Sequence, residues 1–149
     1  MPNEDGPADP EASIEQKIAI DRVVQDVAGR DALCSFALYA GYLREDDRGR
    51  SDGFDEPQGT WHFGRLNYVL FSGPLAASGY AGLDRRWGSA VPFEIGRKRP
   101  IVELSYLWTA DHSVFVASPP DAAVTVVAGD NTLAEHLLSL RELDAHEWL

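Results

Sequence analysis

The sequence has few of the residues that would fix a function by themselves. It contains one cysteine, Cys34, among 149 residues. A single cysteine excludes an internal disulfide and a zinc cluster built from several cysteines. No apolar run approaches the roughly 18 residues that a membrane helix needs. The first thirty residues also lack the basic start and apolar stretch of a signal peptide. We therefore expect a cytoplasmic protein that does not enter a membrane.

Positive charge is scarce and unevenly distributed. The chain has 24 Asp and Glu against 13 Lys and Arg, which gives a formal net charge of −11. Residues 1–60 carry a net charge of −8, residues 61–109 carry +3 and residues 110–149 carry −6. A field of negative sign opposes association with the phosphate backbone of nucleic acids. We therefore do not expect nucleic acid as a partner.

The middle segment holds a basic island in this acidic chain. Arginine binds carboxylate or phosphate through a planar fork, and tryptophan is a frequent interface anchor. These properties predict a docking patch for an acidic partner or a phosphate group. The alternative is that the same cations pair with the acidic loop at 44–60 or are only solvated. The predicted partner-binding residues are Arg85, Arg86, Trp87, Arg97, Lys98 and Arg99.

The sequence contains no motif that defines a catalytic or metal site. None of the four histidines has a metal-ligand spacing. The tripeptide 111–113 has the residue types of a hydrolytic triad, but consecutive residues cannot converge on one reacting atom. We assign no catalytic residue, no metal and no cofactor. The alternative of a small enzyme or ligand-binding domain would use a pocket near His62 and Arg65. The histidines are His62, His112, His136 and His146.

The N-terminal part predicts a tail followed by a helix. Residues 1–12 are rich in acidic residues, Pro and Gly, which predicts a flexible acidic tail. Ser13 and Gln16 have the spacing of a capping box at a helix start. Gly29 is a natural C-terminal stop. The apolar stripe between them comprises Ile14, Ile18, Ile20, Val23, Val24 and Val27.

The centre of the chain predicts two strands and a second helix. Residues 32–43 alternate as a central strand does, although a buried helix is the alternative for so apolar a run. Residues 44–60 form a long charged loop rich in Gly and Pro, which is either mobile or used for binding. Residues 60–66 predict the second strand. A helix is predicted to begin near Pro74 and to end by Gly88.

The C-terminal third predicts three strands and a helix. Apolar residues alternate with polar ones over residues 102–108, a turn follows at 109–112, and residues 113–118 and 123–129 continue as strands. Thr132 and Glu135 have the spacing of a capping box at the last helix. The element order is α-β-β-α-β-β-β-α. It predicts one α+β domain over 13–149, with helices packed on an antiparallel sheet of about five strands.

This order resembles the roadblock/dynein-light-chain family. The stretch VELSYLWTADHSVFVASPPDAAVTVVAGDNTLAEHLLSL carries the resemblance, because two tight hairpin turns lead into a closing helix. The similarity of topology extends over residues 13–142. It implies a non-enzymatic dimer that extends its sheet across subunits and binds or regulates a Ras-like GTPase. The seventeen-residue loop and the pair Gly73–Pro74 depart from the pattern at the middle helix, and no family residue transfers by position.

These observations together predict a non-catalytic protein-interaction module that acts as an adaptor or regulator. Its expected partners are another protein and a second copy of the chain. A different hypothesis is an acidic inhibitor, an immunity protein or a secretion chaperone. Polymorphic-toxin immunity proteins and type III secretion chaperones are similar in composition and bind basic partners through acid-rich surfaces.

Overall fold

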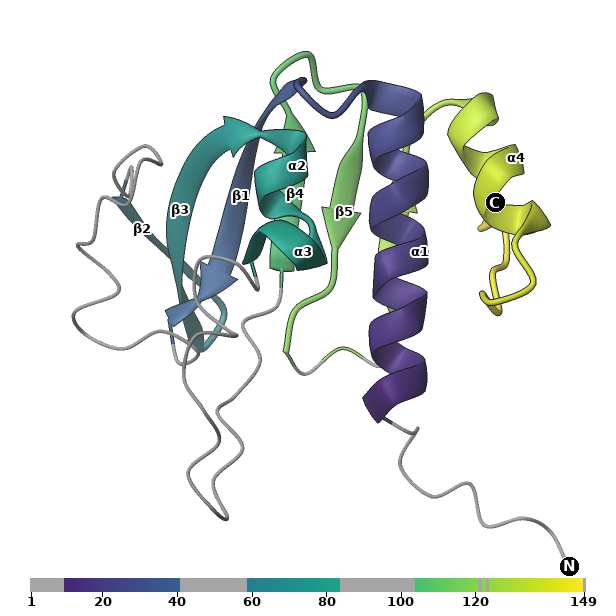
Figure 1. The fold of residues 1–149 in the computed structure, drawn as a ribbon. Helices are drawn as coiled ribbons and strands as arrows, with labels where there is room; N and C mark the ends of the chain where they lie inside the picture. Colours follow the sequence, from purple (N-terminus) through teal and green to yellow (C-terminus); the bar gives the residue numbers. More distant parts are fainter. Residues whose placement is uncertain (1–9, 41–58, 84–103, 121, 123, 149) are drawn as a thin grey trace, which may run out of the picture.

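A computed structural model describes residues 10–40, 59–83, 104–120, 122 and 124–148. This part of the chain forms one antiparallel sheet of six strands with helices packed on it, which confirms the α+β class. The strand order is β2-β3-β1-β4-β5-β6 (Figure 1). The elements are α1 (Pro10–Ala28), β1 (Leu33–Tyr39), β2 (Gly59–Phe63), β3 (Leu66–Pro74), α2 (Leu75–Ser78), α3 (Tyr80–Leu83), β4 (Leu104–Thr109), β5 (Phe115–Ala117), β6 (Val126–Ala128) and α4 (Asn131–Ser139).

The first helix is longer than the sequence pattern predicts. It begins at Pro10, so Ser13 lies inside the helix and is not its cap. Proline suits a first helical position because its fixed φ is helical and its missing N–H has no partner there in any helix. The predicted stop is confirmed. Gly29 has a φ of 95°, and its N–H donates to the carbonyl of Gln25 at 2.9 Å.

The segment after this helix is a strand, as predicted. Cys34, Phe36 and Leu38 alternate onto one face of β1 and are buried there. That face packs beneath the helices, with α1 and the α2–α3 pair lying over it (Figure 1). Phe36 stacks on Phe71 of β3 with ring centroids 5.6 Å apart. The main hydrophobic core therefore lies between this face of the sheet and the helices.

The second predicted strand is confirmed over residues 60–63 but ends earlier than predicted, because a hairpin turn follows. Strand β2 ends at Phe63 and β3 starts at Leu66, with the turn at Gly64 and Arg65 between them. Gly64 has a φ of 63°, a left-handed conformation that glycine adopts without steric cost. The following residues to Pro74 continue as β3, which gives six strands where about five were expected.

The middle helix starts where it was predicted but is interrupted. Helix α2 begins at Leu75 directly after Pro74, and Gly79 returns to an extended conformation before α3. A Cβ atom on Gly82 would lie 2.6 Å from the carbonyl oxygens of both Ala76 and Ala77. The two short helices therefore pack closely because this position has no side chain. Residues 84–88 of the predicted helix lie outside the described residues.

The C-terminal third follows its prediction apart from the helix cap. Strands β4, β5 and β6 form a meander. Asp130, not Thr132, caps α4, because its Oδ1 accepts the backbone N–H of Leu133 at 2.9 Å. Aspartate is among the best N-cap residues, since its carboxylate both accepts this bond and faces the positive end of the helix dipole.

Substitution of Gly82 tests the close packing of α2 and α3. We expect Gly82→Ala to lower the free energy of unfolding by about 1–3 kcal/mol, the usual cost of inserting a methyl group into an occupied position. Gly73→Ala is the matched control, because a Cβ there meets no atom within 4 Å. Urea unfolding followed by circular dichroism measures both. Equal losses for the two variants would contradict the packing described.

Candidate functional site

The residues predicted to bind a partner lie outside the described residues. This applies to the whole basic island, namely Arg85, Arg86, Trp87, Arg97, Lys98 and Arg99, and to residues 44–58 of the acidic loop. Residues 1–9 of the predicted tail are likewise outside, whereas residues 10–12 belong to α1. The predicted docking patch stays a prediction.

The alternative site near His62 lies on the outermost strand of the sheet. His62 is exposed on β2, and its Nδ1 is hydrogen-bonded to Oδ1 of Asn67 across the hairpin. Arg65 is exposed in the turn of the same hairpin. The observed partner of this histidine is thus an amide on the neighbouring strand, not a carboxylate. That contact stabilises the hairpin and does not form an acid–base pair.

A second cluster of side chains covers the sheet face that is turned away from the helices. In β1, Phe36 and Leu38 enter the main core, whereas Ala37 and Tyr39 belong to this second cluster. We call it the aromatic face. Its aromatic members are Tyr39, Trp61, Phe63, Tyr68, Tyr106, Trp108 and Phe115.

The aromatic face is concave. Trp61 on β2 and Tyr106 on β4 are three strand spacings apart, which is about 14 Å across a flat sheet. Their ring centroids nevertheless lie 5.2 Å apart, and both rings also contact Tyr68, at 5.5 and 5.3 Å. The sheet must therefore curl toward this face, and Figure 1 shows β3 bent along its length.

An irregularity in β4 accompanies this curl. Ala37 pairs with Tyr106 but Leu38 pairs with Leu104, so Ser105 is one extra residue on β4. A bulge of this kind increases the local twist and bends the strand that contains it. The Ser105 side chain is buried, and within the described part of the chain its Oγ has no hydrogen-bond partner.

The rim of the aromatic face is exposed and uncharged. Phe63 is 57% exposed and Phe115 is 40% exposed, and each ring contacts Tyr106, at 6.3 and 6.5 Å. No acidic or basic side chain occurs among the strand positions described on this side of the sheet. Those positions are Leu33, Ser35, Ala37, Tyr39, Gly59, Trp61, Phe63, Leu66, Tyr68, Leu70, Ser72, Pro74, Tyr106, Trp108, Phe115, Ala117, Val126 and Ala128.

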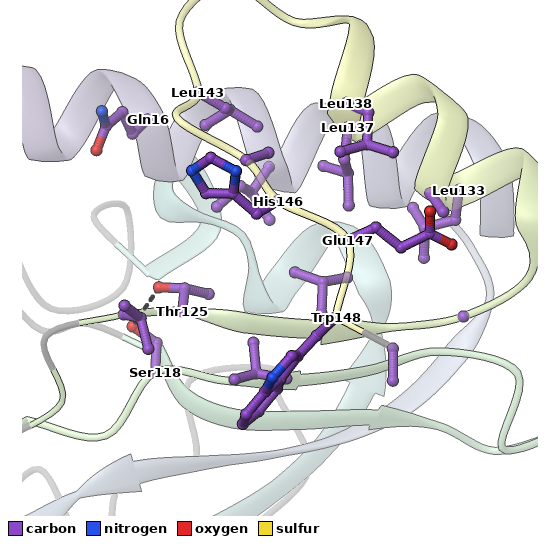
Figure 2. A pocket seen from close by; sticks show the side chains of 18 of the residues that line it. Gln16, Ser118, Thr125, Leu133, Leu137, Leu138, Leu143, His146, Glu147 and Trp148 are labelled. Carbon is purple, nitrogen blue, oxygen red and sulfur yellow. Dashed lines mark hydrogen bonds between the residues drawn. The ribbon is translucent and has the colours of Figure 1, made fainter.

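A groove of about 1060 Å³ lies at the β6 edge of the sheet, between α1, α4, β6 and the C-terminal segment 143–148. We call it the edge groove, because β6 is the last strand of the sheet. Figure 2 shows the α4 leucines on one side of it and Thr125 and Ser118 on the other. The Oγ1 of Thr125 donates to the Oγ of Ser118 at 3.0 Å. The apolar lining includes Ile20, Val126, Val127, Leu133, Leu137, Leu138 and Leu143.

The C-terminal segment adds a large apolar ring and charged groups to this groove. Trp148 is 90% exposed, and its indole extends from the segment on the strand side of the groove (Figure 2). His146 Nε2 lies 3.1 Å from Asp144 Oδ1, and both side chains are almost fully exposed. Glu147 also lines the groove. The edge groove thus combines an apolar lining with an acidic margin.

The exposed large apolar side chains gather on these two surfaces. Of the seven in the described residues, four line the edge groove and two form the rim of the aromatic face. Contiguous exposed apolar area marks a surface that binds a protein, a membrane or a ligand. The four in the groove are Val124, Val126, Leu138 and Trp148, the two on the rim are Phe63 and Phe115, and Leu33 lies apart.

The turn after β4 holds Asp111, a titratable group whose pKa is displaced. Asp111 Oδ1 accepts the hydroxyl and the backbone N–H of Ser113, at 2.7 and 3.0 Å. These two bonds lower the pKa of Asp111 to about 2. His112 has a φ of 60°, so the turn is tight. The tripeptide 111–113 therefore shapes a hairpin and does not align a nucleophile with a base.

Neither the described residues nor a comparison with known proteins assigns a membrane helix, a metal site or a family. No described helix is long and apolar enough to cross a membrane. In the same residues, no group of three or more His, Cys, Asp or Glu side chains is placed to hold a metal ion. No family model, no curated protein and no solved structure matches the chain.

Cys34 is shielded from reaction. Its side chain is buried in the main core, and burial raises the pKa of the thiol to about 11, against a smaller lowering by a hydrogen bond with Ser78. Because the thiolate is the nucleophile, this environment makes Cys34 inert.

The pH dependence of stability tests this burial. The unfolded chain deprotonates its thiol near pH 9 while the folded chain keeps the proton to about pH 11. The folded state therefore binds more protons in that window, and the free energy of unfolding falls as the pH rises from 9 to 11. We expect the fall to be smaller in Cys34→Ala, measured by urea unfolding at each pH. A thiol that reacts with iodoacetamide equally fast in the folded and unfolded chain would contradict this prediction.

Proposed function

We propose that this protein is a non-catalytic protein-interaction module that forms a homodimer through its aromatic face. The observation that carries the proposal is the exposed pair Phe63 and Phe115 on an uncharged face of a chain with a net charge of −11. We expect it to act in the cytoplasm as an adaptor or regulator, with a further protein as its partner.

Electrostatics favours this face for contact between two identical copies. Two chains of the same sign repel each other, and acidic groups brought together at an interface would add to that repulsion. The aromatic face has no Asp, Glu, Lys, Arg or His in its described strand positions. It is therefore a surface on which a second copy meets no charge of its own sign.

Packing favours the same contact. The rim phenylalanines rest on Tyr106, which is itself nearly buried, so they are held in place before a partner arrives. Burying an exposed phenylalanine ring stabilises a complex by about 1.5–3 kcal/mol at most. In a two-fold dimer each residue contributes twice.

Two predictions from the sequence concern the partner protein, namely a Ras-like GTPase or the target of an inhibitor or chaperone. Regulation of a Ras-like GTPase remains a prediction that depends on the roadblock resemblance. The structure has three strands between its first and second helices, one more than the pattern on which that resemblance was based. The inhibitor or chaperone hypothesis is supported by a specific observation, the acidic margin of the edge groove.

Removal of the exposed rings tests the dimer. We expect the wild-type chain to be dimeric at micromolar concentration and Phe63→Ser/Phe115→Ser to raise the dimer dissociation constant about 100-fold, since four rings are lost per dimer. Size-exclusion chromatography with light scattering measures both. The matched control is Val124→Ser/Leu138→Ser, which removes two exposed apolar side chains away from the aromatic face. A strictly monomeric wild type, or an equal effect of the control pair, would contradict the proposal.

A further inference from the structure

The edge groove follows the outer edge of the last strand of the sheet. In the described part of the chain β6 pairs with β5 on one side and ends the sheet on the other. Residues 124–129, which include β6, all line the groove. An edge strand presents backbone N–H and C=O groups that a further extended segment can pair with. The groove therefore offers backbone hydrogen bonds along one wall.

Side chains on both faces of β6 can contact an extended segment that binds in the groove. Val127 packs toward the main core, where Leu133 and Leu137 of α4 also lie. Val126 pairs with Ala117, so it lies on the opposite face of the sheet, and it is exposed. Successive side chains of an added strand would alternate between the helix face, which α4 and the C-terminal segment border, and the opposite face, where Val126 lies.

The charges around the groove favour a bound segment of positive charge. Asp130, Asp144 and Glu147 line it, and among its lining residues Lys17 is the only lysine or arginine. Both members of the pair Asp144 and His146 are exposed, so the carboxylate is accessible to a partner. This acidic margin complements lysine or arginine and disfavours a second copy of the acidic chain.

We propose that the edge groove binds an extended segment of a partner protein in which basic and apolar residues alternate, and that this segment adds a strand to β6. The inference rests on the proposal that the chain is an interaction module, but not on dimer formation. Basic side chains of the segment face Asp130, Asp144 and Glu147. Its apolar side chains lie on the opposite face of the sheet and cover Val126, which is exposed in the chain alone.

Binding of synthetic peptides to the full-length protein tests this site. The probe is a fluorescein-labelled peptide of four lysine–valine repeats, and fluorescence anisotropy gives its dissociation constant. A glutamate–valine peptide of the same length tests the charge preference, and a lysine–valine peptide with its central valines replaced by proline tests backbone pairing. We expect saturable binding of the first peptide and at least tenfold weaker binding of the other two, because proline cannot donate to a β-ladder.

Two double variants, each of which removes two negative charges, test whether the peptide binds in the groove. We expect Asp144→Asn/Glu147→Gln to weaken the lysine–valine peptide about fivefold, as the loss of two exposed ion pairs predicts. The matched control is Asp26→Asn/Asp31→Asn, which changes the net charge equally at exposed positions outside the groove. We expect this control to leave the dissociation constant within twofold of the wild type.

Two results would overturn the inference. Equal weakening by the two charge pairs means that the peptide is attracted only by the overall negative charge. Equal binding of the proline-containing peptide means that no strand is added to β6. Either result leaves the dimer untouched, and Phe63→Ser/Phe115→Ser must still bind the lysine–valine peptide, so failure of this site and failure of the dimer can be distinguished.

Discussion

Burial of β1 on both of its faces is the constraint on which the rest of the structure depends. The strand lies in the middle of the sheet, between β3 and β4. Its alternate residues supply the main core through Phe36 and Leu38, and the aromatic face through Ala37 and Tyr39. Because side chains alternate across a strand, a shift of one residue in register would exchange these two sets. The aromatic face and the hydrophobic core are therefore fixed by the same pairing.

The curl of the sheet converts a row of aromatic residues into a surface with a buried centre and an exposed rim. Tyr68 and Tyr106 are shielded by their neighbours, whereas Phe63 and Phe115 remain accessible. Rings held by edge-to-face contacts lose little conformational freedom when a partner covers them. On the opposite margin of the sheet, β6 is short and borders the edge groove. The two surfaces thus use different chemistry, uncharged rings on one and acidic groups with exposed backbone on the other.

The sequence predicted the elements that depend on one clear periodicity. The stripe in α1, the alternation in β1 and the C-terminal meander were all recovered. The prediction from sequence failed where one residue decides the geometry. Gly64 ends the second predicted strand in a hairpin turn. Asp130 replaces Thr132 as the cap of α4. Local spacing does not reveal which of two nearby polar residues accepts a hydrogen bond from a free backbone amide of the first turn, since that depends on where the chain enters the helix.

The candidate surfaces were harder to predict than the fold. The i, i+2 pairs Trp61/Phe63 and Tyr106/Trp108 are visible in the sequence, and they become a single surface only when β2 and β4 are known to approach across a curled sheet. That approach is a property of strand order and twist, which no local pattern encodes. The edge groove is similar, because it joins residues from both ends of the chain.

The buried position of Cys34 has a consequence for how copies of this chain associate. The only sulfhydryl group in the sequence is enclosed in the core, so the folded protein does not present it for a disulfide to another subunit. The proposed dimer would then be held by reversible contacts and would follow mass action. The proportion of associated chains will then rise and fall with the amount of protein present, which makes abundance itself a control on the assembled state.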